Sequence, residues 1–226
     1  KDNKKLLSPD LKNGNNVIIS GNLTLYAKSG KFQINVIKIL EKPSKGDFWR
    51  KYKDLEKKLR LSGIFDPIHK KKIPKIPQNI GIITSEEGDV FNDICTILKR
   101  RNSNLIINLY SSPVQGDYSV DSIIKGIKYI NSKMSDIIEV IIIARGGGSI
   151  EDLYSFNNEM LVKTIFESKI PIISAIGHDN NQTLVDFVSD MSASTPSVAA
   201  ELVSEKLDNV SDLILNLEEK LNIMID

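Results

Sequence analysis

The sequence predicts an α/β fold in which helices cover both faces of a parallel sheet. Two observations lead to this prediction. Apolar runs of strand length, without the alternation of a half-exposed strand, lie at residues 80–84, 105–110, 140–144 and 170–176. Amphipathic helical patterns follow them at 86–101, from Val120 to Ile130, within 152–168 and within 182–189. Strands that are apolar on both faces and separated by such helices are typical of a parallel sheet between two helical layers.

A β-hairpin and a helix are expected before this domain. Apolar residues alternate in two runs within residues 16–41, and Lys28-Ser29-Gly30 supplies the turn between them. Because an isolated hairpin is marginally stable, we expect it to be the remnant of a larger β-domain or to pack on a neighbour. Residues 47–62 then show a helical pattern, and a connector rich in Pro and Lys leads to Pro77.

A different pattern begins at Thr195. Thr195 can cap a helix, and Pro196 suits the first turn of that helix. The apolar residues that follow are spaced alternately by three and four positions, at Ala200, Val203, Leu207, Val210, Ile214, Leu217, Leu221 and Met224. This heptad spacing favours the start of a coiled coil over a helix packed against the domain. The predicted domains are 1–42, 43–196 and 197–226, and we expect the chain to be part of a longer protein.

The composition is that of a folded protein in a reducing compartment. Hydrophobic residues make up 41% and charged residues 26% of the 226 residues, which allows a substantial core. The single cysteine, Cys95, excludes an internal disulfide, and its amphipathic surroundings predict a buried thiol. No apolar run has the length of a membrane span and no signal-peptide pattern opens the chain, so we expect a cytoplasmic protein.

Positive charge is concentrated in one segment. Residues 42–75, called the basic stripe below, hold 12 Lys or Arg and 4 Asp or Glu, a local balance of +8 in a chain of net charge +1. Such a stripe suits a polyanionic partner, although a solvated helix and linker would have the same composition.

Three of the predicted strands end in residues that suit chemistry, namely Thr84-Ser85, Arg145-Gly146-Gly147-Gly148-Ser149 and Gly177-His178-Asp179. Ligands of parallel sheets bind beyond the carboxyl ends of the strands, so we expect these groups to face one cleft. The glycines let backbone N–H groups surround an anion, and Arg145 adds a cation. Ser149 can cap the next helix, with Asp152 completing a capping box. The pattern favours phosphate recognition over a glycine-rich turn with a paired arginine.

His178 and Asp93 are the candidates for proton transfer. His178 follows an apolar strand and a glycine, the position of an exposed catalytic group, whereas His69 in the connector is expected to be structural. Asp93 lies about two turns into the helix after Ser85, where it can orient His178 or Arg145 or be an ordinary surface aspartate. Further carboxylates are Glu151, Asp152, Asp179 and Asp186. The sequence has no His or Cys cluster with zinc spacing, and a carboxylate-bound Mg²⁺ is compatible with it.

Eight motifs carry a resemblance to a known family. In chain order they are Ser62-Gly63-Ile64-Phe65-Asp66, Gly81-Ile82-Ile83-Thr84-Ser85, Val114-Gln115-Gly116, Arg145-Gly146-Gly147-Gly148-Ser149-Ile150-Glu151-Asp152-Leu153, Phe156-Asn157, Ser174-Ala175-Ile176-Gly177-His178, Asp186-Phe187-Val188 and Thr195-Pro196-Ser197. In this order they resemble the catalytic domain of the exodeoxyribonuclease VII large-subunit family, over residues 44–201.

The resemblance implies a fold, an activity and a partner. Members have an N-terminal OB-fold, of which residues 16–41 would be the last strands. They also have a long helical segment that binds several small subunits, and it would begin at residue 197. Members hydrolyse single-stranded DNA from both ends to oligonucleotides and then 5′-phosphomononucleotides. They often do so without divalent metal, so that no cofactor is strictly required and Mg²⁺ is optional.

Carried over by motif, the essential residues are Asp93, Arg145 and His178. We expect His178 to transfer protons or to attack covalently, and Asp93 to orient it or to hold an optional metal. The residues expected to bind phosphate beside Arg145 are Thr84, Ser85, Gly146, Gly147, Gly148 and Ser149. The supporting residues are Glu151, Asp152, Asn157, Asp179, Asn181 and Asp186.

The sequence departs from the family pattern in two places. After Gly-His the family usually has Glu-x-Asp, whereas this chain has Asp179, Asn180 and Asn181. After Thr-Ser the family usually has Gly-Ala-Ala, whereas this chain has Gly88-Asp89-Val90. The predicted function is the catalytic core of a single-stranded DNA exonuclease. Asn181 favours the alternative, a catalytically weakened DNA-binding scaffold that recruits a small helical subunit. A sugar-nucleotide or phosphosugar enzyme fits the sheet but explains neither the basic stripe nor the heptads.

Overall fold

The computed structural model describes residues 17–26, 30–41, 45–116, 118–147, 153, 155–177 and 182–204. It divides into two compact units, Lys1–Asp54 and Leu55–Asp226, which are considered separately.

The first unit contains the predicted hairpin. Strands β1 (Val17–Tyr26) and β2 (Lys31–Glu41) pair antiparallel, with Leu23 opposite Ile34 and Leu25 opposite Phe32. The register shifts between Ser20 and Gly21, where a Cβ on Gly21 would lie 2.4 Å from the carbonyl oxygen of Asn35. Only glycine fits this close approach. The helix predicted at 47–62 is α1 (Lys45–Leu61), which begins in this unit.

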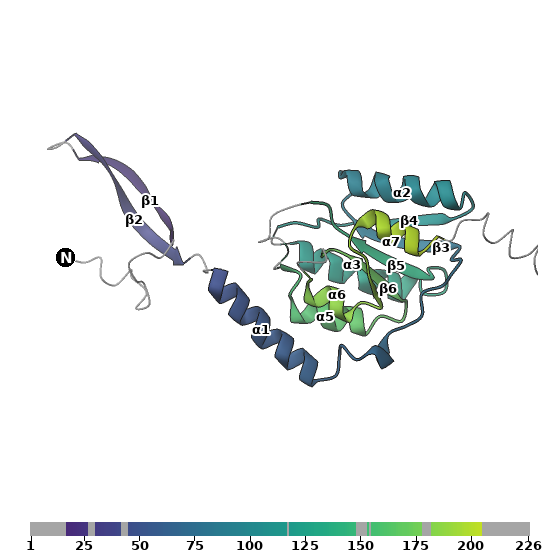
Figure 1. Cartoon of the computed structure of the whole chain (residues 1–226). Coiled ribbons are helices and arrows are strands. Elements are labelled where there is room, and N and C mark those ends of the chain that lie inside the picture. Colours follow the sequence, from purple (N-terminus) through teal and green to yellow (C-terminus); the bar gives the residue numbers. More distant parts are fainter. Residues whose placement is uncertain are drawn as a thin grey trace, which may run out of the picture. The chain divides into compact units, whose positions relative to one another are not determined.

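The second unit confirms the predicted parallel sheet. Among its described residues five strands are hydrogen-bonded in the order β4-β3-β5-β6-β7, and every pairing is parallel (Figure 1). The strands are β3 (Asn79–Thr84), β4 (Ile106–Ser111), β5 (Val140–Ala144), β6 (Ile172–Ala175) and β7 (Met191–Ser192). Four of them match the apolar runs of the sequence.

The fifth strand, β7, was not predicted. It has two residues and no apolar run, so the sequence carries no strand signal there. The residues on either side of β7 join it to β6. The backbone N–H groups of Asp190 and Ala193 donate to the carbonyls of Ile172 and Ser174 at 3.0 and 2.8 Å.

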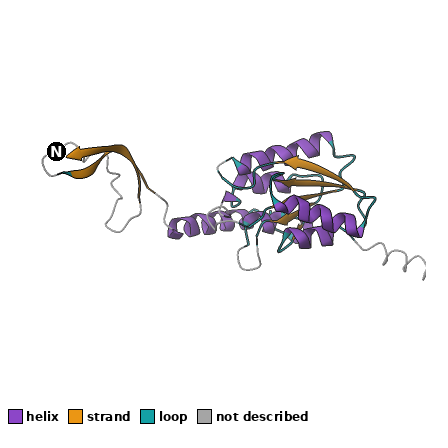
Figure 2. Cartoon of the chain, turned by 90° about the horizontal axis from the view of Figure 1, so that it is seen from above, coloured by secondary structure: helices purple, strands orange, loops and turns teal. Residues whose placement is uncertain are grey.

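Helices cover both faces of the sheet, as predicted (Figure 2). On one face α2 (Asp89–Arg101) packs against α7 (Pro196–Leu202). On the other, α5 (Glu159–Phe166) lies between α3 (Ser119–Lys133) and α6 (Leu184–Val188). A short 3₁₀ helix, η2 (Pro67–His69), lies in the connector that follows α1.

One hydrophobic core lies where the sheet meets α2 and α7. Ile80 and Ile82 of β3 and Ile142 of β5 are fully buried there, together with Ile94 and Leu98 of α2. The amphipathic pattern of α2 thus predicted its buried face correctly. Cys95, one residue beyond Ile94, is only half-buried, and that burial raises the pKa of its thiol.

The start of the predicted coiled coil belongs to the α/β body. Ala200 and Val203 are the first two apolar positions of the heptad pattern, and both are buried in the core, 0% and 1% exposed. Small alanines let α7 approach α2 closely, and the side chain of Arg101 donates to the carbonyls of Glu201 and Ser204 at its end. The helix thus packs on the α/β body as far as residue 204, and the predicted boundary of a separate helical segment at residue 197 stays a prediction. The remaining heptad positions lie outside the described residues.

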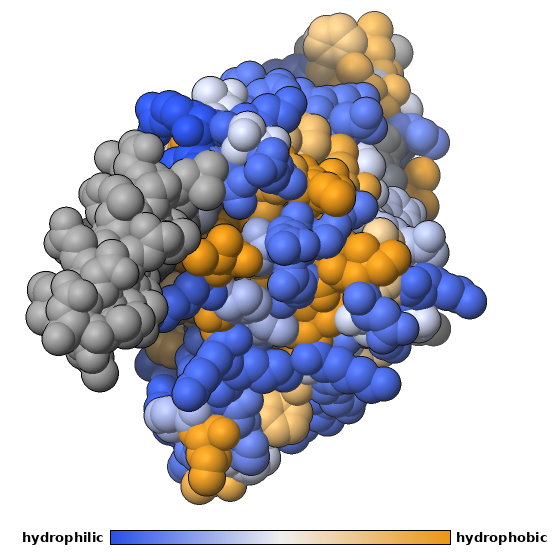
Figure 3. Space-filling model, turned by 90° about the vertical axis from the view of Figure 1, so that its right-hand side faces the viewer, coloured by the Kyte–Doolittle hydropathy of each residue, from blue (hydrophilic) through white to orange (hydrophobic). Residues whose placement is uncertain are grey.

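Outside the hairpin, exposed apolar side chains in the described chain are mostly scattered. On the face drawn in Figure 3, hydrophobic residues lie between hydrophilic ones. Such scatter is ordinary for a protein surface and indicates no partner by itself. A search of the described helices finds none with the length and hydropathy to cross a membrane.

Candidate active site

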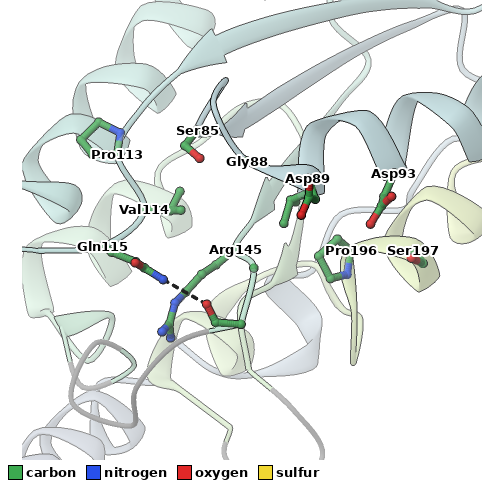
Figure 4. Close-up of a pocket in the computed structure, with 13 residues that line it drawn as sticks. Ser85, Gly88, Asp89, Asp93, Pro113, Val114, Gln115, Arg145, Pro196 and Ser197 are labelled. Atoms are coloured by element: carbon green, nitrogen blue, oxygen red, sulfur yellow. Dashed lines mark hydrogen bonds between the residues drawn. The ribbon is translucent and has the colours of Figure 1, made fainter.

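A cleft opens at the carboxyl ends of β3, β4 and β5. The chain runs from β3 outward to β4 and then returns to the other side of β3 at β5, so β3 and β5 flank a topological switch point. Parallel sheets bind ligands at such points. The cleft encloses about 670 Å³ and is lined by Ser85, Gly88, Asp89, Val90, Asp93, Pro113, Val114, Gln115, Arg145, Gly146, Gly147, Pro196 and Ser197 (Figure 4).

Arg145 is the buried cation of this cleft. It directly follows β5, its backbone N–H donates to the carbonyl of Ala175 at 3.2 Å, and the residue is 4% exposed. Its side chain extends into the cleft beside Gln115 (Figure 4). A guanidinium held in a partly dehydrated cleft attracts an anion more strongly than one in water, because solvent screens it less.

The glycine turn after Arg145 leaves the backbone uncovered at Gly147 but not at Gly146. A Cβ on Gly146 would lie 3.0 Å from Cγ2 of Val90, whereas a Cβ on Gly147 would meet no atom within 4 Å. Gly147 therefore faces open space, and a bound group could approach its backbone closely. Gly148 and Ser149, which complete the predicted phosphate turn, lie outside the described residues.

Gln115 holds this glycine turn from the neighbouring strand. Its side-chain amide donates from Nε2 to the carbonyl oxygen of Gly147 at 3.1 Å (Figure 4). The loop that carries Gln115 is fixed at its start, where the backbone N–H of Ser112 donates to the carbonyl of Thr84 at 2.9 Å. Gln115 belongs to the motif Val114-Gln115-Gly116, but its sequence context predicted no role for it. Its contact joins loops that follow β4 and β5, which sequence spacing alone does not place together.

The end of β3 contributes Ser85 and the start of α2. Ser85 lines the cleft and is half-buried. Gly88, the N-cap of α2, also lines it, and no side chain caps this helix start. Thr84 does not line the cleft. It is fully buried, and its hydroxyl has no hydrogen-bond partner in the structure. Since successive strand residues point in opposite directions, Ser85 rather than Thr84 is the hydroxyl that a ligand can reach.

Asp93 lies in the cleft but away from the arginine. It is exposed, and its described side chain forms no ion pair with that of Arg145. Figure 4 shows it toward the end of the cleft where Pro196 and Ser197 of α7 lie, whereas the guanidinium points toward Gln115. Of its predicted roles, an orienting contact to Arg145 is therefore not seen, and those toward His178 or an optional metal stay predictions. Asp89, one turn earlier on α2, lines the same cleft and was not predicted.

Asn157 and Asp186 support the chain after β6. The Oδ1 of Asn157 accepts from the backbone N–H of Leu184 at 2.8 Å. Asp186 is buried and forms a capping box with Thr183, accepting from its backbone N–H at 2.7 Å and its hydroxyl at 2.8 Å. Its other oxygen accepts from the hydroxyl of Ser174. These contacts fix the start of α6, and neither residue lines the cleft.

The remaining predicted site residues lie outside the described residues. They are His178, Glu151, Asp152, Asp179 and Asn181. Within the described part of the chain, no three His, Cys, Asp or Glu side chains gather as metal ligands would.

Part of the basic stripe serves the fold. Lys70 Nζ donates to the carbonyl of Ser189 at 2.9 Å, and burial lowers the pKa of this lysine. The backbone N–H of Lys71 donates to Asp190 Oδ1 at 2.7 Å, and the Nζ of Lys71 lies 3.5 Å from the same oxygen. Lys58 Nζ forms an ion pair with Glu159 at 2.7 Å. Three of the cations in the stripe thus hold the connector and α1 to the α/β body.

Comparison with known proteins identifies the family. The model of the family "Exonuclease VII, large subunit" matches residues 64–226. The exodeoxyribonuclease 7 large subunit of Clostridium beijerinckii is 44% identical over 222 residues, which are 98% of this chain and 55% of that protein. That of Clostridioides difficile is 41% identical over 212 residues, 94% of this chain and 52% of the relative. The chain thus spans about half the length of the curated relatives it matches. As the motifs predicted, it belongs to the exonuclease VII large-subunit family.

Proposed function

We propose that this chain is the catalytic core of an exonuclease that hydrolyses single-stranded DNA from both ends to oligonucleotides and 5′-phosphomononucleotides. One observation carries the proposal beyond family membership. Buried Arg145 and the uncovered backbone of Gly147 lie together in a cleft at the switch point of the sheet. A cation beside an open backbone suits a phosphodiester, whose charge is concentrated on two non-bridging oxygens.

The cleft residues divide the steps of hydrolysis. Arg145 neutralises the charge that develops on the phosphate, helped by backbone N–H groups of the glycine turn and by Ser85. His178 either protonates the leaving oxygen while water attacks phosphorus, or attacks phosphorus itself with departure of that oxygen, after which water releases the phosphate from the histidine. Asp93 orients His178 from the rim of the cleft. No step requires a metal, and Mg²⁺ is compatible with Asp89 and Asp93 on adjacent turns of α2.

The hairpin and the helical segment have separate proposed roles. β1 and β2 are the last strands of an OB-fold that delivers single-stranded DNA. Leu23, Leu25 and Phe32, which share one face of the hairpin, are 59–75% exposed, as expected for strands that complete a larger β-domain. Residues 205–226 begin the helical segment that recruits several copies of the small subunit, which the heptad spacing of this region supports.

One observation favours a second candidate, a weakened enzyme that serves as a DNA-binding scaffold. Asn181 replaces the usual aspartate, and an amide cannot carry charge or act as a base. Arg145 and the cleft would then bind DNA with slow or no cleavage.

Hydrolysis of labelled single-stranded DNA separates the two candidates. The full-length large subunit carrying this sequence is assayed with its small subunit, with and without EDTA, beside Arg145→Ala and Arg145→Lys. We expect wild-type cleavage in EDTA and its loss in Arg145→Ala. Arg145→Lys keeps the charge but not the bidentate geometry, so it should cleave slowly. Binding without cleavage by the wild type would support the scaffold, and full activity of Arg145→Ala would contradict the role of the cleft.

A further inference from the structure

α1 carries a cluster of aromatic and basic side chains that the cleft does not use. Trp49, Tyr52 and Lys53 lie at positions i, i+3 and i+4, so they share one face of the helix. The two rings meet edge to face, with centroids 5.4 Å apart and planes at 87°. Lys53 Nζ lies 5.7 Å from the centroid of the Trp49 ring and 5.3 Å from that of Tyr52. All three residues lie within the first unit.

Trp49 is unusually exposed for its type. It is the only tryptophan of the chain, and 52% of it is accessible. Tryptophan is highly buried on average, and the half-exposed indole leaves a flat apolar face on which a ligand can stack. The edge-to-face contact with Tyr52 fixes the orientation of the indole. A rigid ring loses little conformational entropy when a ligand stacks on it.

Two other aromatic groups in the described chain show what ordinary packing looks like. Arg60 lies 5.9 and 5.8 Å from the rings of Phe65 and Phe187, but both rings are partly buried and contact each other at 5.9 Å. Tyr129 is 50% exposed, and its ring lies 5.9 Å from that of Tyr110, which lies beside Gly126. Packing explains the contacts of Phe65 and Phe187. Tyr129 is about as exposed as Trp49 but has no cation over its ring among the described residues, so a Tyr129 variant is a suitable control for Trp49 variants.

The charge around Trp49 selects the ligand. The cluster lies in the basic stripe, with its local balance of +8. Three cations of the stripe contact the α/β body, at Lys58, Lys70 and Lys71, and Lys53 instead lies over two rings. Exposed rings interleaved with lysines match a polyanion that also offers flat aromatic faces. Single-stranded nucleic acid has both properties, whereas in a duplex the base faces are already stacked.

We propose that Trp49 and Tyr52 form a base-stacking site for single-stranded DNA, with Lys53 contacting the phosphate beside the stacked base. The proposal rests on the proposed function for its choice of DNA as the nucleic acid. The site binds without sequence preference, since every base offers an aromatic face. It lies on α1 and adds to the cleft a contact that holds the strand but takes no part in the chemistry.

The single tryptophan makes the test direct. The fluorescence of the 226-residue chain reports on Trp49 alone, and it is titrated with oligothymidylate, with an abasic oligomer of equal length and with duplex DNA. We expect oligothymidylate to quench the emission and the abasic oligomer, which has the same phosphates, to leave it nearly unchanged. Equal quenching by the abasic oligomer, or no quenching at saturation, would overturn the proposal.

Variants separate stacking from charge. In a binding assay with a labelled oligomer, Trp49→Ala should weaken binding about 5- to 100-fold, the range that follows from losing one base–aromatic stack. Trp49→Phe should lie between that variant and the wild type, and Tyr129→Ala should bind like the wild type. Lys53→Gln should reduce the slope of log affinity against log salt by about 0.7, the value for one phosphate of a single strand. An unchanged affinity of Trp49→Ala, with its helix content intact by circular dichroism, contradicts the site.

The outcome is independent of the cleavage assay. Arg145→Ala should keep the fluorescence quenching, because the two sites share no residue. Quenching by DNA without any hydrolysis would leave this proposal standing and remove the proposed enzyme activity. Hydrolysis without quenching would do the reverse.

Discussion

The phosphate turn can be tested by adding one methyl group to Gly147. In the described chain, positive φ angles occur at Gly30, Gly63 and Gly116. Gly147 is not among them, so its backbone conformation does not require glycine. A Cβ on Gly147 would also meet no protein atom within 4 Å. Gly147→Ala should therefore keep or slightly raise stability, by up to about 1 kcal/mol through the unfolded state. If a phosphate approaches this backbone, however, the methyl group occupies its place.

The expected result is a folded protein with poor turnover. Loss of one preorganised contact to the developing charge costs about 10²-fold or more in rate, so kcat/KM of Gly147→Ala should fall by that order. Gly146→Ala is the matched variant, since its methyl would lie 3.0 Å from Val90 and should lower both stability and rate. Urea unfolding and hydrolysis of labelled single-stranded DNA measure the two effects. Near-normal kcat/KM in a folded Gly147→Ala would refute the phosphate turn.

Four further predictions test individual side chains. Thr84→Val should raise stability by about 1 kcal/mol and leave turnover unchanged, because it removes a buried hydroxyl without a partner; a loss of turnover would restore Thr84 to the site. Gln115→Ala and Gln115→Glu, neither of which can donate to Gly147, should both lower kcat/KM about tenfold with normal melting, and retained activity in either would remove the positioning role. Asp186→Ala should lower the free energy of unfolding by about 2–4 kcal/mol, because the capping box is lost and the partners at Thr183 and Ser174 are left unsatisfied. A loss below about 1 kcal/mol in urea or thermal unfolding would contradict these contacts. Lys163 and Lys58 lower the pKa of Glu159 to about 2. The stability that the Glu159 carboxylate contributes is therefore present above pH 4.5 and is lost as the pH falls toward 2. The small difference in Tm between the wild type and Glu159→Gln should vanish at pH 2.

The sheet could be predicted because its strands carry their own signal. β5 is apolar at every position, and the amphipathic helices between strands leave a parallel connection as the simple solution. β7 could not be predicted, since it exists only through hydrogen bonds to a neighbouring strand. The heptad spacing was ambiguous in another way. A helix that packs small residues into a domain core and one that enters a coiled coil share the same spacing, and α7 is of the first kind at Ala200 and Val203.

For the site, sequence predicted the strand ends but not the direction of the side chains. The place of Arg145 in the cleft was predictable because it directly follows a buried strand, and parallel sheets bind ligands beyond the carboxyl ends of their strands. Thr84 and Ser85 are adjacent, and only the pleat of β3 decides that the serine faces the cleft. Asp186 was predicted only as a supporting carboxylate, and the structure shows that Thr183 and Ser174 donate hydrogen bonds to its two oxygens. Oδ1 accepts a single hydrogen bond and keeps a second lone pair, but these contacts fix Asp186 at the start of α6, and it does not line the cleft. We therefore expect the chemistry to proceed without Asp186 as the substitute for the aspartate that position 181 lacks.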